Sequence, residues 1–454
     1  IMSVELREMI NFHLTGKRSA DSQSQRGGLV PAALAPYRDL AQIRYDYPLV
    51  LLEGPNSDVF VDTLTGIVNR LLRDIAPQGS EGDLLRQHVL RLEARMRDLA
   101  TDGLGIPLDE LWQRAERSLL ADCESDEAEW VGNSIATARF ALRSKGQVVD
   151  CDAQVPARLV THAWRRVIAG RDDFSNEISS LIIGLKDLLK VDDLKYGASR
   201  TPQKLKAAVG KRHSDLFDFD RLSELLDDTS PRNCLPVARK RRVREALDVL
   251  ESQQFFAVAE GQEVFDFVFD SLAAALKAYN KRLPAMTELV RAVAIAELEL
   301  GNGYVDDQHD SYFERFGVQA LSLEDIMQFP SYLVCLHESE CNTRDLARLI
   351  EIVNAEMPIK VLIHVSEPLG EPMAVGGPAH RGSFAQQLAN TFVAGNAFVM
   401  QAPASNLYKQ RDAIVKGLAY EGPAIFSVFV PFQDAGLEVP PYIAAAATLE
   451  SRVF

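Results

Sequence analysis

The chain has 454 residues, 47% hydrophobic and 25% charged, which is enough for two or three domains and is typical of a globular protein rather than a disordered or collagen-like one. Its formal charge of −15, from 64 acidic and 49 basic residues, argues against nucleic acid and anionic membranes as partners. The five scattered cysteines do not suggest a secreted disulfide framework, and no apolar run reaches about 20 residues, so we expect a cytoplasmic protein without a membrane span.

Residues 1–58 are expected to form an irregular N-terminal segment with one short strand. Serine, glycine and proline are frequent over residues 18–37, which favours irregular backbone. The apolar run at 47–52 then predicts a buried strand, closed by the turn signal Glu53-Gly54-Pro55. The chain opens on Ile1 and stops at Phe454 without a polar tail, which is consistent with a piece of a longer polypeptide.

Residues 59–300 are expected to be mainly helical, because apolar residues recur there three and four positions apart, as in Leu85, Val89 and Leu92. This region also carries a basic run at 239–244. Such a run can bind phosphate or an acidic partner, but it is more often a solvated helix face, and we favour the solvated face.

Residues 301–454 are expected to form an α/β unit. Short, nearly continuous apolar runs predict strands, and the segments between them predict helices; the strands are expected at 332–336, 360–365, 397–400 and 424–430, and the helices at 344–353, 383–391, 408–418 and 442–449. This alternation is typical of a parallel sheet covered on both faces. Ligands of such sheets bind beyond the carboxyl ends of the strands.

A specific sequence pattern lies near the end of this unit. Residues 396–401 lead through the helix expected at 408–418 to Tyr420-Glu421-Gly422-Pro423 and an apolar strand. This arrangement resembles the end of the thiamine-diphosphate domain of pyruvate and other 2-oxoacid:ferredoxin oxidoreductases. The resemblance covers about a quarter of the chain and implies a thiamine-diphosphate-type parallel sheet preceded by the mainly helical region. Physically, Gly422-Pro423 ends a helix and begins a strand, so the pattern itself is structural.

The resemblance also implies where a cofactor would sit. The family holds Mg²⁺ and thiamine diphosphate with a Gly-Asp-Gly sequence at one strand end and with oxygen ligands from the loop after the next strand. In this chain the corresponding residues that could contact the cofactor are His337, Glu338, Ser366 and Glu367. No catalytic residue is assigned, although Glu53 is a candidate for the family's thiamine-activating glutamate. The alternative for Glu53 is a buried strand-end glutamate paired with a neighbour.

Two further patterns have a chemical and a structural interpretation. Cys335, His337 and Cys341 lie close in sequence to Glu338 and Glu340, as in a metal site, but a single Cys/His pair without a second favours a core cysteine and a cysteine at a helix start. We therefore assign no metal ligands. The glycine-rich loop at 376–383 can bind an anion, yet it lacks the Walker and Rossmann patterns, which favours a surface turn.

The leading hypothesis is a divergent, non-catalytic component of a 2-oxoacid:acceptor oxidoreductase-type redox complex, with a role in scaffolding or assembly. Its expected partners are other subunits, including iron–sulfur proteins, and we expect an oligomer without nucleic acid or membrane. The first alternative is an active 2-oxoacid oxidoreductase component that binds thiamine diphosphate and Mg²⁺ with altered ligands. The second alternative is a helical protein-interaction module.

Overall fold

The computed structural model describes residues 46–54, 59–100, 105–169, 172–195, 201–209, 218–228, 235–259, 261–366, 396–431, 441–450 and 454. Its contacts divide the chain into two compact units. The first unit comprises residues 1–170, 268–275 and 331–454, and the second comprises residues 171–267 and 276–330. The first unit therefore combines residues from both ends of the chain.

The first unit contains an antiparallel sheet with the strand order β2-β1-β4-β3 in its described part. Its strands are β1 (Leu49–Leu52), β2 (Val61–Thr63), β3 (Ile106–Pro107) and β4 (Gly146–Val149). β1 is central, because Leu49 is paired with Thr63 on one side and with Val149 on the other. The strand expected at 47–52 is confirmed, whereas β2, β3 and β4 lie inside the region expected to be mainly helical.

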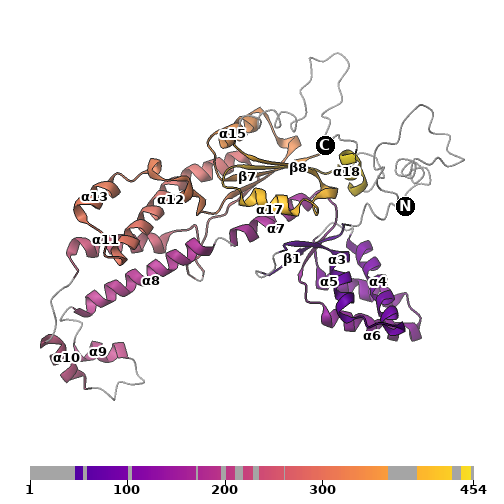
Figure 1. Ribbon diagram of the computed structural model, residues 1–454, viewed down its shortest axis with the longest axis horizontal. Coiled ribbons are helices and arrows are strands. Elements are labelled where there is room, and N and C mark those ends of the chain that lie inside the picture. The colour runs from indigo at the N-terminus through magenta and orange to yellow at the C-terminus, as the bar shows by residue number, and fades with distance from the viewer. Residues whose placement is uncertain are drawn as a thin grey trace, which may run out of the picture. The chain divides into compact units, whose positions relative to one another are not determined.

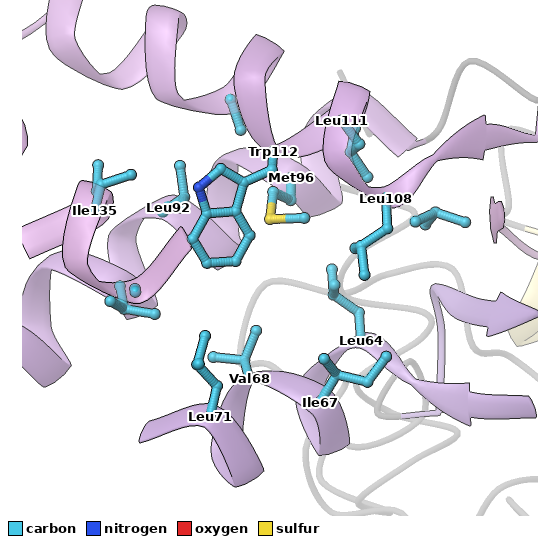
Figure 2. Packing of buried hydrophobic residues seen from close by; sticks show 14 of the residues in the cluster. Leu64, Ile67, Val68, Leu71, Leu92, Met96, Leu108, Leu111, Trp112 and Ile135 are labelled. Carbon is cyan, nitrogen blue, oxygen red and sulfur yellow. The ribbon is translucent and has the colours of Figure 1, made fainter. Parts of the chain in front are cut away.

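A helical layer shares one apolar core with this antiparallel sheet. The helices are α3 (Leu64–Ile75), α4 (Ser80–Ala100), α5 (Leu108–Ala121) and α6 (Ser125–Ala141). Their apolar faces pack with sheet residues such as Val50 and Val148. Figure 2 shows the indole ring of Trp112 from α5 beside Leu92 and Met96 of α4, with the apolar side chains of α3 facing them.

The first unit also contains a parallel sheet, which confirms the α/β expectation for the C-terminal part of the chain. Its strands are β5 (Val268–Phe269), β6 (Tyr332–His337), β7 (Ile359–Val365), β8 (Phe398–Pro403) and β9 (Ala424–Phe429). The described strands run in the order β5-β6-β7-β9-β8, and every neighbouring pair is parallel. All of β9 and most of β7 are buried, as expected for strands covered on both faces.

Helices cover both faces of the parallel sheet. α15 (Thr343–Asn354) lies on one face, and α7 (Val155–Ala169) and α17 (Arg411–Ala419) lie on the other (Figure 1). The connection from β6 to β7 steps in the opposite direction to that from β8 to β9, so right-handed crossovers place α15 and α17 on opposite faces. Short 3-10 turns, η3 (Glu338–Glu340) and η4 (Ala404–Asn406), follow β6 and β8, and α18 (Pro441–Glu450) follows β9. The helix expected at 383–391 lies outside the described residues.

The second unit is helical in its described part. Its elements are α8 (Asp172–Lys195), α9 (Pro202–Val209), α10 (Phe219–Asp228), α11 (Val237–Ser252), most of α12 (Leu272–Leu300), α13 (Asp306–Glu314), η2 (Val318–Ala320) and α14 (Leu323–Met327). The Phe329 ring contacts those of Phe174 and Phe255 edge to face, with centroid distances of 5.8 and 4.8 Å. Across both units, none of the described helices is long and apolar enough to cross a membrane.

Candidate functional site

Two histidines meet at the carboxyl end of the parallel sheet. β6 and β7 are parallel neighbours, and their register pairs His337 with His364. The Nδ1 atoms of the two rings are 3.0 Å apart, and the ring centroids are 4.7 Å apart. At this distance one imidazole donates an Nδ1–H and the other accepts it. The structure thus brings together one of the expected cofactor-binding residues and a histidine outside the expected set.

The environment of His364 favours its neutral form. Burial, and as a second cause the neighbouring His337, lowers the pKa of His364 to about 4. The Nε2 atom of His364 is buried, and it has no hydrogen-bond partner among the described residues. At neutral pH this site therefore presents a neutral imidazole with one unused nitrogen rather than a positive charge.

Glu338 and Cys341, which the sequence analysis considered as candidate ligands, lie in the segment after His337. Glu338 is half-buried in η3, and the Cys341 thiol donates to the backbone oxygen of His337 at 3.3 Å. Burial, followed by the charges of Asp345, Glu338 and Glu340, raises the pKa of Cys341 to about 12. Burial also raises the pKa of Cys335 to about 11, so neither thiol is ionised at neutral pH.

Cys335 and Cys341 have the structural positions that the sequence favoured. Cys335 is on strand β6, and Cys341 directly precedes the Asn342 cap of α15. Asn342 accepts a hydrogen bond from the backbone nitrogen of Arg344, while Asp345 accepts one from the backbone nitrogen of Asn342. Within the described ranges, no group of three or more His, Cys, Asp or Glu residues is arranged to hold a metal ion.

The described strand ends do not fit a magnesium-pyrophosphate group. Mg²⁺ prefers an octahedral set of oxygen ligands. The ends of β6 and β7 offer two imidazoles, the Glu338 carboxylate and the half-buried hydroxyl group of Ser366, which directly follows β7. The fourth expected residue, Glu367, and the loop at 376–383 lie outside the described residues.

The amino end of the same sheet is built around a buried lysine. Lys360, near the start of β7, is only 1% exposed, and its amino group donates to the backbone oxygens of Tyr420 and Gly422, the latter at 2.7 Å. The Tyr420 hydroxyl group donates to Asn396 at 2.8 Å. The Tyr-x-Gly-Pro pattern thus forms a hydrogen-bonded turn at the start of β9, which agrees with its structural interpretation.

A polar cleft in the first unit was not anticipated. It has a volume of about 480 Å³ and lies between the end of β1, β4 and one face of α7. Its lining includes Glu53, Arg158, His162 and Arg165, so Glu53 is an exposed cleft residue rather than a buried strand-end carboxylate. The sequence feature that could have indicated this cleft is the segment of helix α7. It carries three arginines and no acidic residue, although acidic residues outnumber basic ones in the whole chain.

Most basic side chains of the run at 239–244 form ion pairs within the second unit. Arg239 and Arg242 both form ion pairs with Glu299, at 2.6 and 2.9 Å, and Glu299 is 2% exposed. Lys240 forms ion pairs with Asp192 and Asp193. These contacts join α11 to α12 and α8, so the solvated-face interpretation is wrong for these three side chains.

Comparison with protein-family models, with curated proteins and with solved structures gives no match. The possible chemistry of each site therefore follows from its residues alone. The histidine pair offers proton transfer and nitrogen coordination, the amino end of the sheet is structural, and the cleft on α7 offers cationic hydrogen-bond donors.

Proposed function

We propose that this chain is a non-catalytic component of a redox complex of the 2-oxoacid:acceptor oxidoreductase type, in which its α/β unit supports assembly. The observation that carries the proposal is the contrast between the two ends of the parallel sheet. The Tyr420-to-Gly422 turn, which carries the resemblance, has complete hydrogen bonds to Lys360. The opposite end has an imidazole pair, and the only side-chain oxygens described directly after β6 and β7 are those of Glu338 and Ser366.

This contrast favours assembly over catalysis for a physical reason. A buried lysine that bridges two backbone oxygens stabilises one backbone arrangement, which is a structural role. A magnesium-dependent cofactor instead needs carboxylate or carbonyl oxygens at the carboxyl ends of the strands. Two of the residues present there, His337 and His364, are poor ligands for such a hard cation.

Thermal unfolding in the presence of Mg²⁺ and thiamine diphosphate tests the proposal. A ligand that binds only the folded chain, at a hundred times its Kd, stabilises it by about 2.7 kcal/mol. We expect no saturable rise in melting temperature when both are added to the full chain. A saturable rise that needs both Mg²⁺ and thiamine diphosphate would contradict the proposal.

The same titration separates the proposal from the enzymatic alternative. An active component with altered ligands would use Glu338 and Ser366 as oxygen donors, so Glu338→Ala and Ser366→Ala would abolish the stabilisation. Lys416→Ala, at an exposed position of α17, is a suitable control because it removes a charge from a helix that carries none of these oxygen donors. Co-purification with iron–sulfur polypeptides is expected for the redox complex and not for an unrelated helical interaction module.

A further inference from the structure

The polar cleft of the first unit has features of a small-molecule site. It is formed by residues of the first unit alone, and its volume of about 480 Å³ is within the usual range for small ligands. One wall is the end of β1 with Glu53, a second is Gln147 on β4, and the third is helix α7. The cleft shares none of its lining residues with the strand ends that carry His337 and His364.

Helix α7 presents one polar face to this cleft. Arg158, Thr161, His162 and Arg165 are spaced at i, i+3, i+4 and i+7, so they lie on the same side of the helix, and all four line the cleft. The residues between them are apolar, and several, including Leu159, are buried in the unit. A helix that packs by its apolar side therefore turns its arginines towards the cleft.

Arg158 is held in a defined position. Its Nη1 atom lies 3.4 Å from the Asp152 carboxylate, and that carboxylate accepts a hydrogen bond from the backbone nitrogen of Gln154 at 2.9 Å. An added Cβ atom at Gly105 would be 3.6 Å from Arg158 Nη1 and 3.7 Å from Gln147 Oε1, so both side chains approach the same glycine.

The wall made by β1 is tied to α7 through one carbonyl group. His162 Nε2 donates to the backbone oxygen of Leu52 at 3.0 Å, and Arg166 Nη1 donates to the same oxygen at 3.3 Å. Burial is the main cause that lowers the pKa of His162, so its imidazole is neutral at neutral pH. The charged groups of the lining are therefore two guanidinium groups and the carboxylate of Glu53.

Arg165 is the least constrained of these charges. It is exposed and forms no ion pair with any residue in the described part of the chain. It lies seven residues after Arg158, which is about 10 Å along the helix axis. Long side chains at this separation can reach two acidic groups of one ligand, and guanidinium groups bind carboxylate and phosphate oxygens in pairs.

We propose that the cleft binds a small organic dianion, with Arg158 and Arg165 contacting its acidic groups and with Glu53 and Gln147 contacting a hydroxyl group. The shared chemistry is that of a dicarboxylate or a phosphate monoester. This inference does not depend on the proposed assembly function, because it uses other residues.

Isothermal titration calorimetry of the full chain with malate, a hydroxylated dicarboxylate, and, separately, with glycerol 3-phosphate tests this site. We expect saturable binding of one molecule per chain for at least one probe, weakened by added salt. The comparison of the two probes distinguishes a dicarboxylate site from a phosphate site. Absence of binding by both probes at millimolar concentration would overturn the proposal.

Matched arginine variants locate the binding. Arg165→Gln is expected to raise Kd at least tenfold without changing the melting temperature, because Arg165 is exposed. Arg73→Gln, which removes the same charge from an exposed position on α3, should leave Kd unchanged. Arg158→Gln should also raise Kd, but its contact with Asp152 makes Arg165 the cleaner test. Equal Kd values for Arg165→Gln and Arg73→Gln would place the anion elsewhere and reject the cleft.

Discussion

The two ends of the parallel sheet are built in different ways. At the amino end, the side chain of Lys360 donates to two backbone oxygens of the turn before β9. At the carboxyl end, His337 and His364 contact each other, and the buried Nε2 atom of His364 has no hydrogen-bond partner in the described structure. Buried polar groups that lack partners are costly and are uncommon in structural parts of a fold.

This difference indicates which end of the parallel sheet contributes more to stability. The amino end has the features of a structural element, because every group named there has a partner and the lysine is 1% exposed. The carboxyl end has the features of a binding site, because the Nε2 atom of His364 has no hydrogen-bond partner within the described fold. Substitutions at the amino end should therefore affect folding strongly, and those at the carboxyl end should mainly affect how stability depends on pH.

Replacement of the buried lysine should have the largest effect. Lys360→Met keeps most of the side-chain volume but leaves the backbone oxygens of Tyr420 and Gly422 without their donor. Because an unsatisfied buried polar group costs about 1–3 kcal/mol, we expect the free energy of unfolding to fall by about 3 kcal/mol. Urea unfolding followed by circular dichroism measures this loss.

Lys416→Met provides the control for that substitution. Lys416 is exposed on α17, and we expect a change within about 0.5 kcal/mol. Similar unfolding midpoints for the two variants would mean that the Lys360 contacts are not structural. The contrast between the two ends of the sheet would then be lost.

Substitution of Gly417, which is in α17 shortly before the Tyr420-to-Gly422 turn, should have the next largest effect on stability. An added Cβ atom at Gly417 would lie 2.5 Å from Phe398 Cε1 and 2.7 Å from Phe426 Cζ, both on strands of the sheet. Gly417→Ala is therefore expected to lower stability by about 2 kcal/mol through overpacking. Gly132→Ala is the matched control, since its nearest neighbour, Leu120 Cδ2, is 3.8 Å away and alanine favours a helix. A Gly417→Ala variant as stable as the unmodified chain would show that α17 can move away from the sheet.

Most of the parallel sheet could be predicted from the sequence because its main strands are long, apolar runs, whereas the two-residue strand β5 was not expected. β6, β7 and β9 have six, seven and six residues, and each run is bounded by polar or turn residues. β2 and β3 have three and two residues, which is too few to show a period of two. The local pattern around these strands is helical, so only their pairing with β1 and β4 identifies them.

The histidine pair and the cleft were predictable only in part, because a local sequence pattern does not show contacts between distant residues. His337 stands out in sequence because it follows a strand, but its contact with His364 depends on the register of two strands. The ion pairs of Glu299 likewise join residues about sixty positions apart, and no local pattern indicates them. Arg158 and Arg165 share a helical spacing that the sequence does contain. Their role in the cleft depends on the walls formed by Glu53 and Gln147.

The smallest predicted effect concerns the pH dependence of stability at the carboxyl end. The folded pKa of His364 is about 4, whereas an unfolded histidine has a pKa of about 6.5. Between these values the unfolded chain binds a proton that the folded chain does not, so acidification favours unfolding. The stabilising contribution is therefore complete above about pH 6.5 and is lost as the pH falls towards about 4. Because the ring is partly exposed, we expect this contribution to change by about 1 kcal/mol between pH 7 and pH 5.

Two variants isolate this contribution from that of the carboxylates. His364→Asn should lose about 1 kcal/mol less than the unmodified chain when urea unfolding at pH 7 and pH 5 is compared. His337→Asn should reduce the pH dependence without abolishing it, because burial is the first cause of the low pKa and the charge of His337 is the second. An NMR titration of the His364 ring provides the direct measurement. A pKa near 6.5 in the folded chain would mean that the imidazole is protonated there at moderately acidic pH, and would contradict the predicted loss of stability on acidification.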